Sequence, residues 1–178
     1  MGHYRRNDYP GLIIVGSHVQ KTTEQLEHLL QQPGVIGLEI PVSQLTMDTL
    51  SDHRDRLHAQ LHHHWQQNKT PVLYTSRTRE PNAPIPLITQ LITDLIQGLP
   101  PQLSYLISKG GITTNNILSH SLDLTMVRLL GQIIPGVSLV TTPATHPQYP
   151  QLPIVTFPGN VGSPQALSTV YQRLRSGG

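Results

Sequence analysis

Short apolar runs alternate with segments of helical periodicity along nearly the whole chain. GLIIV at residues 11–15 and VIGLEI at residues 35–40 are rich in branched aliphatic residues and do not alternate with polar positions. Such runs are typical of strands that are buried on both faces of a parallel sheet. Similar runs lie at residues 71–76, 103–108, 137–141 and 154–157. The sequence therefore predicts an α/β fold: a mostly parallel sheet with helices on both faces, in three layers (α/β/α).

The segments between these runs have the spacing of amphipathic helices. In the segment that begins at Lys21, Thr22 and Gln25 have the spacing of a capping box. Ser163 followed by Pro164 predicts the start of the last helix. The predicted helices are residues 46–67, 87–99, 113–121 and 163–175, whereas residues 126–134 fit either a helix or a strand.

A single domain accounts for the length of the chain. It has 178 residues, of which 37% are hydrophobic, and no repeat or change in composition divides it. We expect residues 1–10 to be a flexible lead-in and residues 11–178 to form the domain. Cysteine is absent, which excludes disulfides and thiolate chemistry. Because no run has the length or pattern of a membrane span or signal peptide, we expect a cytoplasmic protein without a membrane partner.

The charge pattern does not favour nucleic-acid binding. The net charge is +2, the basic residues are scattered, and the chain has one Phe and one Trp. Nucleic-acid interfaces concentrate basic side chains in a patch, and single-strand binders add aromatic side chains on which bases stack. We therefore expect no nucleic-acid partner.

Three junctions between a predicted strand and the next helix are built from small, flexible residues: VGSHVQKTT, SKGGITTNN and FPGNVGSPQ. In a parallel sheet such turns lie at the carboxyl edge, where open α/β folds bind their ligands. Glycine lets a ligand approach the backbone, and free N–H groups at helix starts favour phosphate. Each junction by itself also fits a purely structural turn. The candidate hydrogen-bond donors are Ser17, Thr113, Thr114 and Asn160, and Lys109 could supply charge.

Other combinations fit a functional site less well. The tract LHAQLHHHW at residues 57–65 contains four histidines, but neighbouring histidines point around a helix and cannot converge on one ion. We therefore expect no metal ligands there. Ser17 and His18 lack a third group that would make a nucleophile and base. Arg77 fits either a phosphate contact or an ion pair with Glu80.

The sequence resembles the C-terminal nucleotide-binding domain of the four-carbon acid sugar kinase family. The matching stretches are GSHVQKTTEQL, VLYTSR, KGGITTNNI, GQIIPGV and FPGNVGSPQAL. They occur in the family's order and together span nearly the whole chain, at residues 16–26, 72–77, 109–117, 131–137 and 157–167.

This resemblance implies ATP-dependent phosphorylation of an acid sugar such as threonate or erythronate. In the family, the N-terminal domain holds the sugar acid and the catalytic base, and the C-terminal domain binds ATP. We therefore expect the acceptor-binding domain to lie outside this sequence, the catalytic residues to be unknown, and Mg²⁺ to arrive as the nucleotide complex. The implied ATP contacts, with Asn160 as an added donor, are Ser17, Gly110, Gly111, Ile112, Thr113 and Gly159.

One departure from the family leaves alternatives open. Many relatives carry an acidic residue where this chain has Ile112, so a carboxylate that would help to hold magnesium is absent. This difference favours a second hypothesis, a free-standing nucleotide-sensing or regulatory module without catalytic activity. A third hypothesis is a fragment that docks onto a partner. An exposed apolar face is expected where the acceptor-binding domain would dock, and a homodimer stays open.

Overall fold

The computed structural model describes residues 4–78 and 80–175. In this part of the chain, seven strands form one sheet with the order β2-β3-β1-β4-β7-β6-β5. Parallel pairing joins β2 to β3, β3 to β1, β1 to β4 and β4 to β7, whereas β6 and β5 are antiparallel to their neighbours. The strands are β1 (Leu12–Val15), β2 (Val35–Ile40), β3 (Thr70–Thr75), β4 (Leu106–Lys109), β5 (Arg128–Ile134), β6 (Val137–Thr141) and β7 (Pro153–Phe157). The predicted mostly parallel sheet is confirmed.

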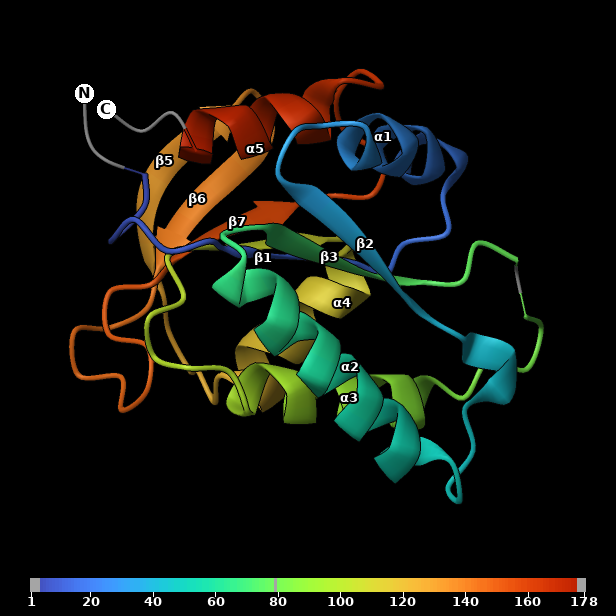
Figure 1. Ribbon diagram of the computed structural model, residues 1–178. Helices are drawn as coiled ribbons and strands as arrows, with labels where there is room; N and C mark the ends of the chain where they lie inside the picture. The colour runs from blue at the N-terminus through green and yellow to red at the C-terminus, as the bar shows by residue number, and fades with distance from the viewer. Residues whose placement is uncertain (1–3, 79, 176–178) are drawn as a thin grey trace.

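Helices cover both faces of the sheet (Figure 1), which confirms the predicted three layers. Helices α1 (Gln20–Leu30) and α5 (Ala166–Arg175) lie on one face. On the other face lie α2 (Leu50–Gln66), α3 (Ile85–Gln97) and α4 (Gly111–Asn116), which the π-helical turn η2 (Ile117–Ser121) continues. A short 3-10 turn, η1 (Val42–Gln44), follows β2.

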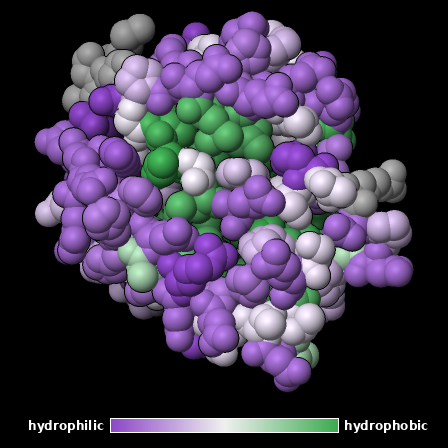
Figure 2. Space-filling model, turned by 45° about the vertical axis from the view of Figure 1, so that its right-hand side comes forward, coloured by the Kyte–Doolittle hydropathy of each residue, from purple (hydrophilic) through white to green (hydrophobic). Residues whose placement is uncertain are grey.

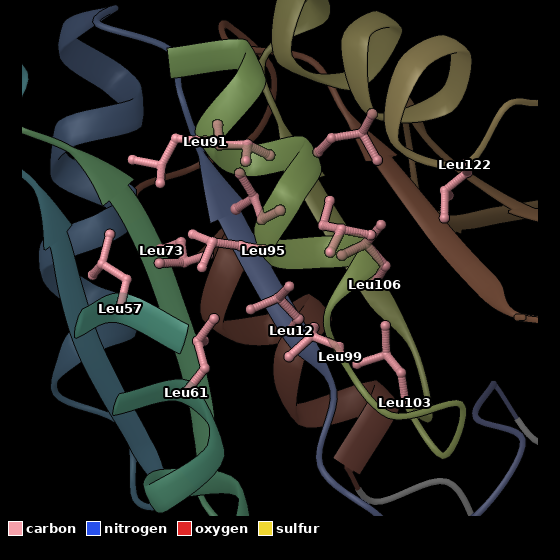
Figure 3. Close-up of a cluster of buried hydrophobic side chains, with 14 of the residues drawn as sticks. Leu12, Leu57, Leu61, Leu73, Leu91, Leu95, Leu99, Leu103, Leu106 and Leu122 are labelled. Atoms are coloured by element: carbon pink, nitrogen blue, oxygen red, sulfur yellow. The ribbon is translucent and has the colours of Figure 1, made fainter. Parts of the chain in front are cut away.

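Two apolar cores explain why the central strands read as unbroken apolar runs. Successive side chains of a strand point to opposite faces of the sheet. Leu12 therefore belongs to the core beneath α2 and α3, and Ile13 to the core beneath α1 and α5. Figure 3 shows the first core, in which leucines of both helices pack on leucines of the sheet. The helical residues include Leu57, Leu61, Leu91 and Leu95, and the strand residues include Leu73 and Leu106.

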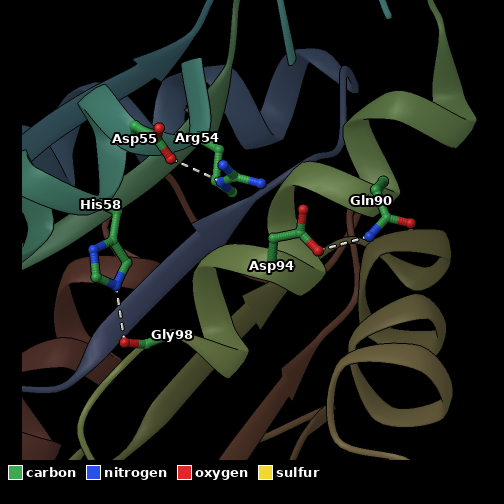
Figure 4. Close-up of polar contacts among 6 residues, drawn as sticks. All are labelled: Arg54, Asp55, His58, Gln90, Asp94 and Gly98. Carbon is green, nitrogen blue, oxygen red and sulfur yellow. Dashed lines mark hydrogen bonds and ion pairs between the residues drawn. The ribbon is translucent and has the colours of Figure 1, made fainter. Parts of the chain in front are cut away.

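Polar contacts add to this packing between α2 and α3. The imidazole Nε2 of His58 donates to the carbonyl oxygen of Gly98, just beyond α3, at 2.8 Å (Figure 4). Along α3 itself, the Gln90 amide donates to the Asp94 carboxylate at 2.6 Å. His58 therefore uses one ring nitrogen to join two helices.

Some element boundaries differ from the predicted ones. Residues 128–134 of the ambiguous segment form β5, because Gly136 has a φ of +77° and turns the chain back into β6. The last helix begins at Ala166 and not beside Ser163. Helix α2 begins at Leu50 and not at residue 46, because Thr46 and Thr49 exchange hydrogen bonds in a turn before it.

Apolar side chains also lie on the surface. Met126, Leu129 and Leu130 are exposed at the β5 edge of the sheet. Figure 2 shows the molecule with the right-hand side of Figure 1 turned forward, and there apolar side chains gather between hydrophilic ones. Among the described helices, none combines the length and the apolar character needed to cross a membrane. The docking and dimer expectations remain predictions.

Candidate functional site

The three glycine-containing junctions begin at adjacent strands. Val15, the last residue of β1, pairs with Lys109 of β4, and Lys109 pairs with Phe157 of β7. The chain leaves β1 toward α1 on one face and leaves β4 toward α4 on the other. Strands that send their connections to opposite faces open a crevice at their carboxyl ends, and this is where open α/β sheets bind ligands.

Ser17 lies at the centre of these junctions. A Cβ added at Gly110 would be 3.1 Å from the Cβ of Ser17, and one added at Gly159 would be 2.7 Å from its Oγ. A Cβ at Gly16 would collide with the Thr113 side chain. The structure thus brings the Gly16–Ser17 turn into contact range of Gly110, Thr113 and Gly159, although the three junctions lie far apart in the sequence. The close approach explains why glycine occupies these positions.

The turn after β4 presents its backbone to the crevice. Gly110 has a φ of +116°, which glycine adopts without steric cost, and its carbonyl oxygen accepts from the amide of Thr114 at 2.9 Å. A Cβ at Gly111 would meet nothing within 4 Å, so open space adjoins this residue. Ile112 is 76% exposed. The Thr114 hydroxyl turns away to donate to Ser108 Oγ at 2.9 Å, so this predicted donor does not face the crevice.

A cavity of about 310 Å³ adjoins this turn. Gly16, Ser17 and residues 110–113 form its polar end. Its other end is apolar and belongs mainly to α3 and η2, with the residues Ile85, Ile88, Ile92 and Ile117. These isoleucines were not predicted as site residues, because a helix face that lines a cavity has the same sequence pattern as one that lines a core. The one signal in the sequence was Ile85, an apolar residue within the proline-rich stretch that precedes the predicted helix.

The turn after β7 adjoins Ser17 but does not line the cavity. Asn160 is exposed, and its side chain has no hydrogen-bond partner in residues 4–78 and 80–175. The turn is held from α1: the Thr22 hydroxyl donates to Gly159 O at 2.9 Å, and Gln25 Nε2 donates to Val161 O at 2.9 Å. The predicted capping box is therefore wrong. Helix α1 has Val19 at its N-cap without a side-chain cap, and Thr22 and Gln25 are fully buried.

Arg77 holds the Gly16–Ser17 turn from the side of β3. Its Nη2 donates to Ser17 O at 2.7 Å and to Thr23 Oγ1 at 2.8 Å. Burial lowers the pKa of Arg77 from its ordinary value, and Tyr74 opposes that shift. Within the described residues Arg77 forms no ion pair with Glu80. The guanidinium thus contacts the backbone of the turn.

Lys109 does not reach the cavity. Its side chain is fully buried, and its Nζ donates to Pro158 O at 2.5 Å, beneath the turn after β7. Burial lowers the pKa of Lys109 from 10.5 to about 7, and the nearby charge of Lys21 contributes to the same shift. Lys109, a possible source of charge in the sequence, thus directs its amine to the turn after β7 and not into the cavity.

The donors around the cavity suit phosphate better than a metal ion. Hydroxyl and amide groups surround its polar end, and the side chains that line it include no carboxylate. Over residues 4–78 and 80–175, no cluster of three His, Asp or Glu side chains could hold a metal ion.

Comparison with known families agrees with this geometry. The sequence model of the nucleotide-binding C-terminal domain family matches residues 12–167. The chain belongs to this family. The match covers every strand of the sheet and all three junctions around Ser17. Nucleotide binding is the function that describes this family, and the crevice is built from residues within the match.

Solved structures share the fold. The chain superposes with a TM-score of 0.78 on a domain of unknown function (DUF1537) from Bordetella bronchiseptica, a domain-swapped dimer with bound citrate, at 21% identity over 94% of this chain and 41% of that one. A DUF1537 protein of Haemophilus influenzae gives a TM-score of 0.70 at 17% identity over 96% and 42%. A putative tRNA synthase from Salmonella typhimurium gives 0.68 at 19% over 99% and 42%.

These likenesses show the fold alone, because all three identities are below 25%. The chain spans about two fifths of the length of these proteins. A search of curated proteins finds no match.

Proposed function

We propose that this chain is the ATP-binding half of a kinase that phosphorylates a four-carbon acid sugar of the threonate or erythronate kind. The observation that carries the proposal is the meeting of Ser17, Gly110 and Gly159 at one crevice beside an apolar cavity. The family match and the resemblance of the junction motifs to those of acid sugar kinases support the same reading.

The polar end of the crevice suits the nucleotide phosphates. Phosphoryl transfer depends on positioning the nucleotide and on stabilising charge around the transferred group. Backbone amides at Gly111, Ile112 and Thr113 begin a helical segment that continues through η2 to Ser121, and the Ser17 hydroxyl lies beside them. Gly110 and Gly159 keep the rim free of side chains, so that phosphate oxygens reach the amides.

The apolar end suits a nucleobase. Ile88, Ile92 and Ile117 offer an apolar enclosure, and Thr89 and Asn116 add polar groups at its wall. Ligand sites of this kind combine a mostly apolar lining with a few placed polar groups. In this arrangement the base enters between α3 and η2, and the phosphates extend toward Ser17.

Magnesium finds few protein ligands here. Mg²⁺ prefers carboxylate and phosphate oxygens, whereas Ile112 occupies the position at which many relatives carry an acid. The residues around the cavity therefore do not fit a protein-held magnesium site. The metal would be held by the phosphates of the nucleotide.

Nucleotide titration of the chain tests this proposal. A ligand that binds only the folded state at a hundred times its Kd adds about 2.7 kcal/mol of stability, so ADP should raise the melting temperature clearly. The chain alone should not phosphorylate threonate, because in the resembled family the N-terminal domain holds the acid sugar and the catalytic base. An unchanged melting temperature in millimolar ADP would refute the nucleotide site. Phosphorylation of threonate by the chain alone would refute the proposal that a separate domain binds and activates the acceptor.

The second candidate function is a nucleotide-sensing module without catalysis, which Ile112 favours. The two functions predict different results in an experiment that adds the acid-sugar-binding domain of a relative. A kinase half should then transfer phosphate to threonate, whereas a sensing module should bind ADP equally well and transfer none.

A further inference from the structure

Lys109 is a buried amine beneath the proposed phosphate site. It ends β4, and its side chain is fully inaccessible to solvent. Its Nζ lies 3.9 Å from the ring centroid of Phe157, the residue with which it pairs across the sheet. Burying an amine in this way is costly unless its N–H groups find acceptors. Their acceptors therefore indicate what the side chain does.

Both acceptors belong to the turn after β7. Nζ donates to Pro158 O at 2.5 Å and to Gly159 O at 3.3 Å, and the Thr22 hydroxyl donates to Gly159 O as well. Two consecutive carbonyl groups of the turn are thus fixed toward the interior, on the side of Lys109 and α1.

The peptide geometry then sets the direction of two amides. In a planar trans peptide, the C=O and N–H groups point in opposite directions. Because the carbonyls of Pro158 and Gly159 point inward, the N–H groups of Gly159 and Asn160 point away from Lys109. Neither amide has a hydrogen-bond acceptor in the described part of the chain. Ser17 Oγ lies against Gly159 on this turn.

We propose that Lys109 is a positioning residue that aims the amides of Gly159 and Asn160 at the phosphates, without contacting the nucleotide itself. The inference rests on the proposed nucleotide site, because it assigns these amides a phosphate acceptor. A neutral amine keeps two N–H donors and a protonated one keeps three, so the turn is held in both protonation states. The lowered pKa of Lys109 agrees with a role that needs donors and no net charge.

The test compares Lys109→Met with Lys69→Met. Methionine keeps the length and apolar character of the lysine stem and removes its hydrogen-bond donors. Lys69 is the control, because it directly precedes β3 and so lies at the end of that strand away from the crevice. Calorimetry with ADP and with adenosine separates the phosphates from the base. We expect Lys109→Met to weaken ADP binding about tenfold while adenosine affinity changes less than twofold, and Lys69→Met to change neither. Unchanged ADP affinity, or an equal loss for both ligands, would overturn the proposal.

Amide spectra of the free protein make the test independent of nucleotide. In Lys109→Met, the ¹⁵N–¹H resonances of Gly159 and Asn160 should shift or broaden more than those of Gly110 and Thr113. If wild-type protein binds no ADP, the proposed function fails, and these spectra still decide whether Lys109 orients the turn. If Lys109→Met does not fold, Thr22→Val provides a second test, because it removes the other donor to Gly159 O. Thr22→Val should also weaken the binding of ADP more than that of adenosine. Equal effects on the two ligands, or no effect on either, would overturn the inference.

Discussion

The hydroxyl of Thr22 donates a 2.9 Å hydrogen bond to the carbonyl oxygen of Gly159, although 137 positions separate the two residues. Thr22 lies in the first turn of α1, and Gly159 lies in the turn after β7. The bond joins the first and last of the three junctions that meet at Ser17. A single side chain on α1 therefore takes part in shaping the phosphate rim, without facing it.

Replacing Thr22 with valine should destabilise the fold moderately. Valine has the same shape, so the loss is that of the hydrogen bond, and Gly159 O keeps its contact with Lys109. We expect the free energy of unfolding to fall by about 1 kcal/mol, measured by urea denaturation. Thr22→Ser keeps the hydroxyl and should retain more of the stability. A loss of stability in Thr22→Ser with none in Thr22→Val would mean that packing of the methyl group, and not the hydrogen bond, matters here.

The sequence predicted the fold well because the cores on both faces of the sheet leave a strong pattern. Ile13 and Leu12 are buried on opposite faces, so their strand appears as an unbroken apolar run. The segment at 126–134 could not be assigned, because Leu129 and Leu130 are exposed on an edge strand and carry no core periodicity.

The site was predicted in part. Glycines at Gly110 and Gly159 marked close backbone approach, which the contacts with Ser17 now explain. Long-range side-chain contacts left no such signal. Thr22 and Gln25 have capping-box spacing, and nothing local indicates that they bind a turn more than a hundred residues away. For the same reason the sequence did not indicate that Lys109 lies buried beneath the turn after β7.

Alanine at Gly111 and at Gly159 should have different effects. A Cβ at Gly111 meets nothing within 4 Å, and the residue lines the cavity, so Gly111→Ala should fold normally and obstruct the ligand. We expect its melting temperature to stay within about 2 °C of wild type, a change of under about 1 kcal/mol, and its ADP affinity to fall about tenfold.

Gly159→Ala should lower both the melting temperature and the ADP affinity, because its Cβ would lie 2.7 Å from Ser17 Oγ and push the two turns apart. Thermal unfolding and ADP calorimetry on both variants provide the comparison. Wild-type ADP affinity in Gly111→Ala would place the phosphates elsewhere.

Arg77 should matter for the shape of the Ser17 turn more than for charge. Its Nη2 bonds both Ser17 O and Thr23 Oγ1, and a lysine can supply the charge but not the same planar pair of donors. We expect Arg77→Lys and Arg77→Met to weaken ADP binding by similar factors. Calorimetric titration of both variants and the wild type with ADP, at two salt concentrations, checks this expectation. If Arg77→Lys bound like wild type while Arg77→Met did not, the charge of Arg77 would be the important property.

The stability of the protein should depend on pH through Lys109. Burial lowers its pKa in the folded state to about 7, whereas the unfolded chain keeps a pKa near 10.5. Between these values the unfolded state binds more protons than the folded state, so the free energy of unfolding should rise as pH increases from about 7 toward 10.5. Below pH 7 both states are protonated, and the contribution of Lys109 becomes constant.

Lys109→Met isolates this effect, because the other titrating groups are common to both proteins. Urea unfolding of wild type and Lys109→Met at intervals from pH 6 to pH 9.5 gives the difference between their stabilities. We expect this difference to be flat below pH 7 and then to shift in favour of wild type as the pH rises. Parallel curves across the whole range would mean that the Lys109 amine titrates alike in the folded and unfolded chains, and that the carbonyl oxygens of Pro158 and Gly159 compensate for its burial.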